Sequence, residues 1–450
     1  MKELERASRR ELIEIIAAQQ GQIDELMARV AELEEENVRL RQGRGGGTPL
    51  AVKPSRPPKE KKERKWRDQA FVRRKETPDE VRYHALECCP DCGRKLEGGW
   101  EHRRRQVIQI LPPQVRIMDH VIIARRCGVC GRRWLPKLTA EVIEAQGQRR
   151  LGVSVQGLVA TLHISCRIPM KMIRRILREL CGLRISAGEI VELLDGTKAA
   201  GKEAIAQLLE QVRASPAVCG DETGWREDGD NGYLWTFATP SIRYFLYRKS
   251  RSAQVPKEVL GEEFEGVVAC DFYAGYNKLG LLQRCWFHLL NDAKELAELN
   301  ADRPQVVAWV EALRHLYEEA KAYSSACREL PADARARHKQ RRRLERAAVV
   351  LARPYAKDPE APQRMLAQRI MKHLHELFVF ISDPAVPATN NLAERSLRPA
   401  VVARKISGGT RSPKGSDTKM GLMSLFGTWQ VQDKPLLATC QQLLLSPTPP

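Results

Sequence analysis

The chain has 450 residues, of which 75 are Lys or Arg and 56 are Asp or Glu, so its formal net charge is +19. This length allows two or three domains with a sizeable core, and the positive charge favours a polyanionic partner, although a ribosome-like or membrane-surface protein would fit the charge equally well. No apolar stretch approaches the ~18 residues that span a bilayer, and the charged, periodic N-terminus is unlike a signal peptide, so we expect a cytoplasmic protein without membrane segments.

Residues 1–42 are predicted to form a coiled-coil helix. Within residues 4–41 a heptad pattern is clearest where β-branched residues or Asn at position a alternate with Leu at position d: Ile23, Leu26, Val30, Leu33, Asn37 and Leu40. This combination favours a parallel two-stranded coiled coil, so we expect a homodimer or higher oligomer through this helix. The alternative is a single amphipathic helix that packs on the body of the protein.

Residues 43–79 are predicted to be a flexible basic linker. The segment begins with a glycine-rich run at residues 43–47, continues through several prolines, and contains the charged run Lys59–Lys65. Such a composition has no apolar face to bury, so it forms no element of its own. We expect it to act as a solvated tether and to contact phosphates without regard to base sequence.

Residues 80–138 are predicted to form a zinc ribbon. Two Cys-x₂-Cys pairs, each followed by Gly, have the spacing of a tetrahedral thiolate site for structural Zn²⁺: Cys89, Cys92, Cys127 and Cys130. Alternating segments at 106–111, 115–118 and 120–123 are expected to be its strands. The alternative is a set of buried free cysteines, and Cys88 could replace Cys89. Zinc ribbons either bind DNA or only stabilise a small domain, and the neighbouring arginine runs favour DNA.

Residues 139–214 are predicted to be a helical segment that either binds DNA or connects domains. Three apolar stripes with helical spacing follow one another, and Ser186 with Glu189 forms a capping-box pattern at the start of the third. The second helix has a basic face: Lys171, Arg174, Arg175 and Arg178. Short helices at this spacing resemble a helix-turn-helix unit. A plain helical connector is an equal alternative.

From residue 215 onward the pattern changes to strands. Apolar or alternating runs at 216–220, 232–238, 243–247 and 267–270 are expected to be strands, with a helix at 253–260. Residues 284–288 (Arg-Cys-Trp-Phe-His) are expected to be a further strand that ends in a structural histidine. Residues 291–380 carry apolar residues at helical spacing and are expected to be helical, because the 122 residues between Asp271 and Glu394 are too many for one loop.

Three carboxylates in this region have the placement of a divalent-cation site. Asp221 follows one apolar run, Asp271 ends another, and Glu394 lies one helical turn after Asn390. Two strands that each end in a carboxylate, with a third carboxylate on a helix, can converge on Mg²⁺, which prefers oxygen ligands. Spacing alone does not exclude the other acidic residues nearby, which are Glu222, Glu227, Asp228, Asp230 and Asp292.

The segments around these acids resemble the motifs of the IS66-family transposases. The resemblance rests on residues 220–226 (GDETGWR), 270–276 (CDFYAGY), 390–399 (NNLAERSLRP) and 404–412 (RKISGGTRS), in this order. It implies a ribonuclease-H-like catalytic domain, built from residues 215–290 and 381–450 and interrupted by an all-helical insertion at 291–380. It also implies that Asp221, Asp271 and Glu394 are the catalytic acids and hold two Mg²⁺ or Mn²⁺ ions.

The expected function is therefore metal-dependent cleavage of DNA at insertion-sequence ends, followed by strand transfer into target DNA. The expected partners are the terminal repeats, target DNA and accessory proteins from the same element, in the bacterial cytoplasm near the nucleoid. One alternative is a ribonuclease-H-fold nuclease or resolvase without strand transfer. Another is a non-catalytic DNA-binding regulator, for which the coiled coil, ribbon and linker would suffice.

Basic residues that flank the third acid are the best candidates for holding DNA phosphates: Arg395, Arg398, Arg404, Lys405 and Arg411. His288 is a candidate contact for DNA or a metal, with a structural role as its alternative. Trp225 fits the core better than a stacking role. The chain is thus expected to be an α+β multidomain protein with a coiled-coil helix, a zinc ribbon, a helix-turn-helix-like segment and an α/β catalytic domain with a helical insertion.

Overall fold

The computed structural model describes residues 20–21, 27, 75–109, 113–147, 149–329 and 333–445, and the chain falls into two compact units, Met1–Gln109 and Ile110–Pro450. Of the predicted coiled coil only residues 20, 21 and 27 are described, as helix, and residues 43–74 of the predicted linker lie outside the described residues. Residues 75–109 contain an isolated bridge between Cys88 and Lys95 and are otherwise irregular.

In the described part of the predicted ribbon, paired strands occur only beside the second cysteine pair. β1 (Arg125–Arg126) and β2 (Arg133–Trp134) are antiparallel and enclose Cys127–Cys130. The strands expected between residues 106 and 123 are absent from residues 106–109 and 113–123, so that prediction is wrong there. Alternation produces a strand only where the apolar face is covered, and here Ile117 and Val121 are 88 % and 77 % exposed.

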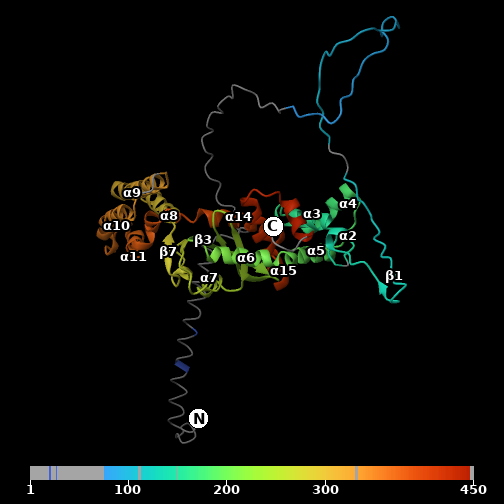
Figure 1. The fold of residues 1–450 in the computed structure, drawn as a ribbon. Helices are drawn as coiled ribbons and strands as arrows, with labels where there is room; N and C mark the ends of the chain where they lie inside the picture. Colours follow the sequence, from blue (N-terminus) through green and yellow to red (C-terminus); the bar gives the residue numbers. More distant parts are fainter. Residues whose placement is uncertain are drawn as a thin grey trace. The chain divides into compact units, whose positions relative to one another are not determined.

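A five-stranded mixed sheet forms the centre of the second unit (Figure 1). In spatial order its strands are β5 (Arg243–Arg248), β4 (Asp230–Ala238), β3 (Ala217–Glu227), β6 (Val267–Cys270) and β7 (Leu281–Arg284). The pairs β5–β4 and β4–β3 are antiparallel, whereas the pairs β3–β6 and β6–β7 are parallel. Helix α7 (Gln254–Leu260) joins β5 to β6 and confirms the helix expected there.

The short strand β6 is apolar throughout because both of its faces are covered. All four residues are buried, and alternate side chains point to opposite faces of the sheet. Val268 and Cys270 belong to the core on one face, whereas Val267 belongs to the core of the helices on the other face. This double burial leaves the end of β6, where Asp271 follows, as the first polar position of the strand.

One core joins the sheet to helices from both ends of the second unit. Trp235 of β4 and Phe426 and Leu443 of the C-terminal helices are buried in it. The helices on this side are α2 (Ala140–Ile143), α3 (Val153–Ile164), α4 (Met170–Cys181), α5 (Ala187–Ala200), α6 (Lys202–Arg213), α14 (Asn391–Ser407), α15 (Pro413–Val431) and α16 (Leu436–Leu445). The capping box predicted at Ser186 and Glu189 is present at the start of α5.

Helix α15 protects the open edge of the sheet. Its Ser424 and Thr428 hydroxyls accept hydrogen bonds from the backbone N–H groups of Phe245 (2.9 Å) and Arg243 (3.0 Å) on the edge strand β5. Unpaired edge N–H groups would otherwise invite pairing with another chain. The C-terminal helices therefore complete the sheet rather than follow it as a tail.

The helices expected for residues 291–380 are present and have a core of their own. They are α8 (Trp286–Leu299), α9 (Pro304–Glu329), α10 (Ala334–Ala356), α11 (Arg364–Lys372), α12 (Leu374–Leu377) and α13 (Val379–Ser382). Leu313, Ala348 and Phe378 are fully buried in this core. Figure 1 shows α9, α10 and α11 at one end of the sheet and α3 and α4 at the other. Within the described residues, no helix has both the length and the apolarity to cross a bilayer.

Residues 284–288 do not form the strand expected from the sequence. β7 ends at Arg284, Cys285 is the N-cap of α8, and His288 lies in the first turn of that helix. The fully buried Trp286 packs among the helices, where its ring N–H donates to the Leu377 carbonyl. A short apolar run fits a strand or a buried helix equally well, and tertiary packing decided in favour of the helix.

Candidate active site

Asp221 and Asp271 lie at corresponding positions on adjacent parallel strands. The last parallel pair of β3 and β6 is Cys219 with Ala269, so each aspartate stands two residues beyond that pair. Neighbouring strands are about 4.8 Å apart, which brings the two residues to one edge of the sheet. Each carboxylate also accepts a nearby backbone N–H at 2.9 Å: Asp221 from Glu222 and Asp271 from Tyr273.

Glu394 reaches the same place from the start of α14. Ala393, the residue before it, packs against Cys219 and Ala269, which each precede one of the two aspartates by two residues. Beyond the last pair of β3 and β6 the Gly220 carbonyl receives a hydrogen bond of 2.9 Å from the side-chain amide of Asn390, which is fully buried. The backbone N–H of Glu394 in turn donates to the Asn390 carbonyl (3.2 Å). Asn390 thus fixes the first turn of α14 to the strand that carries Asp221.

The three carboxylates lie close enough to affect one another's charge. Burial, then the negative charge of Glu222, and then the charges of Asp271 and Glu394 raise the pKa of Asp221 from 3.8 to about 8. Among the ion pairs of the described residues, none includes Asp221 or Asp271. Carboxylates gathered without a basic partner repel one another unless a cation holds them.

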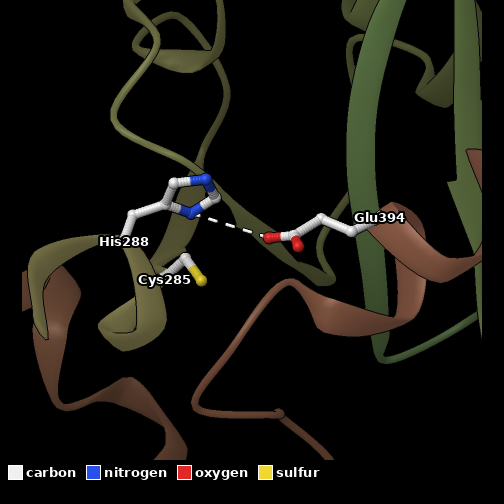
Figure 2. A group of neighbouring side chains, drawn as sticks. All are labelled: Cys285, His288 and Glu394. Carbon is white, nitrogen blue, oxygen red and sulfur yellow. Dashed lines mark ion pairs between the residues drawn. The ribbon is translucent and has the colours of Figure 1, made fainter. Parts of the chain in front are cut away.

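Several buried polar atoms around Glu394 have no hydrogen-bond partner among the described residues. They are Oε1 of Glu394, Nδ1 of His288, Oδ1 of Asn390 and Oδ1 of Asn391. The His288 and Glu394 atoms face each other at 3.8 Å, and Figure 2 shows the ring pointing from α8 toward the carboxylate on α14, with Cys285 beside it. Unpartnered buried polar atoms are rare and usually belong to groups that bind a water, an ion or a substrate. The carboxylate set therefore fits oxygen-preferring divalent cations.

The other acidic residues of the region are engaged elsewhere. Glu222, whose side chain is 2 % exposed, pairs with Arg251 (2.5 Å) and accepts a hydrogen bond from the Tyr276 hydroxyl (2.8 Å). Glu227 accepts from the Ser416 hydroxyl, and Asp292 pairs with Arg369 of the helical bundle. Asp228 and Asp230 are exposed at the turn between β3 and β4. Three of these five acids are thus paired or hydrogen-bonded and two are exposed, whereas Asp221 and Asp271 have no ion pair among the described residues.

Arg284 is a residue that sequence reasoning did not single out. Its guanidinium is 0 % exposed, pairs with Glu376 (2.5 Å) and donates to the Asp271 carbonyl (2.7 Å). It also donates to Asn277, just after the short 3₁₀ turn η2 (Ala274–Tyr276). A buried arginine with these partners holds the backbone that follows β6, and so sets the position of Asp271.

Four of the five predicted basic phosphate-binding residues have exposed side chains, and the fifth is hydrogen-bonded to the sheet. Those with exposed side chains are Arg395, Arg398, Lys405 and Arg411. Arg404 instead donates to the Gly224 carbonyl on β3. Trp225 is 2 % exposed and its ring N–H donates to Thr410 (3.0 Å), which confirms its place in the core.

The Gly-Gly-Thr segment after α14 has a structural role. Gly408 caps the helix with φ 75°, and Thr410 exchanges backbone hydrogen bonds with Arg226 and Asp228, both at 2.9 Å. Gly409 has φ +115°, and a Cβ there would lie 2.2 Å from the Arg226 carbonyl oxygen. This part of the resemblance to the transposases therefore reflects a backbone contact that only glycine permits.

The two cysteine pairs have the same local geometry, each in its own unit. Gly93 N–H donates to the Cys89 carbonyl (2.8 Å) and Gly131 N–H to the Cys127 carbonyl (2.9 Å), with φ +69° and +68° at the glycines. The backbone N–H groups of Asp91 and Cys92 donate to the sulfur of Cys89 and lower its pKa. Those of Val129 and Cys130 do the same for Cys127. N–H groups aimed at sulfur are what a metal-bound thiolate requires.

A family model for the transposase IS66 family matches residues 149–418 of the chain. A search among curated proteins found no match. The matched range begins just before α3 and ends in α15, so it contains the sheet, the helical bundle and the residues that bring Asp221, Asp271 and Glu394 together. The chain belongs to the IS66 transposase family.

Proposed function

We propose that this protein cleaves DNA at the ends of an insertion sequence and joins the freed ends to target DNA, with Asp221, Asp271 and Glu394 as the catalytic acids. Family membership supports a transposase role. The single observation that carries the chemistry is the approach of these three carboxylates, from β3, the end of β6 and α14, which lets Asp271 and Glu394 raise the pKa of Asp221. Asp221 and Asp271 have no ion pair among the described residues, and Glu394 faces only the His288 ring at 3.8 Å. Such a group lies poised for divalent cations rather than for a salt bridge.

The three acids would hold two Mg²⁺ or Mn²⁺ ions, which when bound supply activation of the attacking oxygen and stabilisation of the leaving oxygen. The protein's own part is to keep the carboxylates in place. Asn390 and Arg284 serve this purpose through the Gly220 and Asp271 carbonyls. The first step is hydrolysis at the element end, and in the second the freed 3′-hydroxyl attacks a target phosphodiester. The same residues serve both steps because only the nucleophile changes.

The sheet order supports a ribonuclease-H-like catalytic domain. The spatial order is β5-β4-β3-β6-β7. It places β3 and β6, the first and fourth strands of the sheet in chain order, side by side, with Asp221 on β3 and Asp271 directly after β6. The helices α8–α13 then correspond to the helical insertion expected from the resemblance. Exposed basic residues on and after α14 are the proposed phosphate contacts: Arg395, Arg398, Lys405 and Arg411.

The proposed DNA-binding and assembly functions of the N-terminal segments rest mainly on sequence. Zn²⁺ bound by Cys89, Cys92, Cys127 and Cys130 is supported by the matching geometry of the two cysteine pairs. The basic face of α4 is exposed, with Lys171, Arg174, Arg175 and Arg178 at the surface, as a DNA-contacting helix requires. Dimerisation through residues 1–42 stays a prediction from the heptad pattern.

The proposal is tested with purified protein and DNA that bears the element's own ends. Cleavage and joined products are expected with Mg²⁺ and are expected to vanish with a chelator. Asp221→Asn should abolish cleavage while DNA binding, measured by gel shift, is retained. Asp292→Asn is the matched control, because that acid only pairs with Arg369, and it should cleave like the wild type. Nicked but never joined products would indicate a nuclease, and unchanged activity of Asp221→Asn would refute the catalytic assignment.

A further inference from the structure

A second set of donor atoms lies against the candidate active site. Cys285, His288 and Glu394 each offer one atom, and these atoms all lie within 4.8 Å of one another (Figure 2). It is the one such group of three or more His, Cys, Asp or Glu residues found within the described residues. Cys285 and His288 come from the first turn of α8, and Glu394 comes from the first turn of α14.

Three backbone N–H groups point at the sulfur of Cys285. The N–H of Asn390 donates to it at 3.1 Å, and the N–H groups of Phe287 and His288 at the start of α8 also point at it. Burial raises the pKa of this thiol, and the N–H groups oppose that effect. Donors at a helix N-terminus stabilise a thiolate, so these N–H groups would support the sulfur as a ligand once a cation displaces its proton.

The other two donors lack partners of their own. Nδ1 of His288 and Oε1 of Glu394 are both buried and unpartnered among the described residues, and they stand 3.8 Å apart. In a tetrahedral zinc site, donors lie roughly 3.3 to 3.6 Å apart, so this pair needs to close by only a few tenths of an ångström. The His288 side chain is 38 % exposed, which leaves it room to turn.

We infer that Cys285, His288 and Glu394 form a binding site for a thiophilic divalent cation such as Zn²⁺, which competes with Mg²⁺ for Glu394. Sulfur, nitrogen and oxygen ligands together suit Zn²⁺, whereas Mg²⁺ requires oxygen ligands. Three protein ligands leave a fourth position for water. Zn²⁺ at this site neutralises a carboxylate that the catalytic cations need, so it inhibits DNA cleavage. The inhibition rests on the proposed function, whereas the binding of the cation does not.

The binding is tested with Co²⁺, whose bond to a thiolate gives a charge-transfer absorption band. Full-length protein first receives one equivalent of Zn²⁺, which the four thiolates of the proposed ribbon bind before a site with a single thiolate, and Co²⁺ is then titrated. The wild type is expected to gain one further thiolate band. Cys285→Ser and His288→Ala should lose or weaken it, and the matched control Cys166→Ser, at an exposed cysteine, should keep it. The absence of a band in the wild type, or its persistence in folded Cys285→Ser, overturns the inference.

The consequence for activity is tested separately, with each variant compared with its own rate without Zn²⁺. In the wild type Zn²⁺ should slow Mg²⁺-dependent cleavage, and added Mg²⁺ should restore it. In Cys285→Ser the inhibitory Zn²⁺ concentration is expected to rise at least about tenfold. Inhibition that Mg²⁺ does not relieve, or that is equal in both proteins, refutes the competition. If the wild type cleaves DNA with no metal at all, the proposed function fails, and the cobalt band alone then decides the site.

Discussion

Asn390 makes the contact on which the position of Glu394 most depends, so Asn390→Ala is the most informative substitution. The side chain is 0 % exposed and donates one hydrogen bond, at 2.9 Å, to the Gly220 carbonyl. Alanine removes the donor and leaves a buried carbonyl unpaired, which costs about 1–3 kcal/mol. The hydrogen bond from the Asn390 backbone N–H to Cys285 is unaffected, so the protein is expected to fold.

The effect on cleavage should be larger than the effect on stability. Glu394 follows Asn390 by one helical turn, and its N–H donates to the Asn390 carbonyl at 3.2 Å. A shift of this turn moves the carboxylate relative to Asp221 and Asp271. A misplacement of about 1 Å in a catalytic group costs about 100-fold in rate. We therefore expect DNA cleavage by Asn390→Ala to fall about 100-fold while its free energy of unfolding falls by about 2 kcal/mol.

The matched control is Asn300→Ala, at the C-cap of α8. Its side-chain amide also donates to a backbone carbonyl at 2.9 Å, that of Leu296, but it is only partly buried and lies at the far end of the helix. Its loss should cost at most about 1 kcal/mol and leave the cleavage rate unchanged. Unfolding is measured with urea and cleavage on DNA with the element's ends. Wild-type cleavage by a folded Asn390→Ala protein would show that the hydrogen bond from Asn390 to the Gly220 carbonyl has no role in placing Glu394.

Three further predictions concern stability. Gly409→Ala should lose about 1–3 kcal/mol, because of its positive φ and the clash with the Arg226 carbonyl, and an unchanged urea midpoint would contradict this. Gly188→Ala, in α5, should instead gain about 0.5 kcal/mol, because an added Cβ would meet only the Ser186 Oγ at 3.8 Å, an ordinary van der Waals contact, and a loss would show that the helix start is strained. Burial and the charge of Lys419 lower the pKa of His163 from 6.5 to about 4, so only the unfolded chain gains this proton between those values. The His163 contribution alone should lower stability by about 3 kcal/mol from pH 6.5 to pH 4, whereas the raised pKa of Asp221 acts in the opposite direction over the same range. The measurement is therefore the difference between the wild type and His163→Gln in unfolding curves at several pH values, and this difference should disappear above pH 6.5.

Local patterns predicted the elements whose stability is local. The capping box at Ser186 and Glu189 was read directly from the sequence, because it depends only on neighbours in the chain. The strand β6 was also predicted, because burial on both faces leaves an unbroken apolar run in the sequence. The same holds for the helices between residues 291 and 380. The alternating segment of residues 106–123 shows the limit, since alternation indicates a strand only when another surface covers one face.

The misassigned residues 284–288 hid the Cys285–His288 pair. In a strand, residues three apart point to opposite faces, whereas in a helix they share one face. Interpreted as a strand, the segment separated Cys285 from His288 and made the histidine structural. In the structure both lie in the first turn of α8 and point toward Glu394. Cys-x-x-His at the start of a helix would have been the signal.

The contacts that assemble the candidate site could not be predicted from local pattern at all. Asn390 and Gly220 are 170 residues apart, and Arg284 and Glu376 are 92 apart. No periodicity or propensity links such positions, because their meeting depends on how the helices α8–α13 fold between them. Only the resemblance to a family supplied Glu394 as the third acid.

The fate of two neighbouring carboxylates explains why the site needs cations. Asp221 and Glu222 are adjacent on β3, so their side chains point to opposite faces. Glu222 meets Arg251 and Tyr276 and is neutralised within the protein, whereas Asp221 is buried beside two more acids with no basic partner among the described residues. A fold shaped only by stability would pair or expose such a carboxylate, because an unpaired buried charge is costly. Glu222 avoids this cost by pairing on one face of β3, whereas Asp221 bears it on the other face. This difference indicates that the Asp221 face is kept for a bound positive charge.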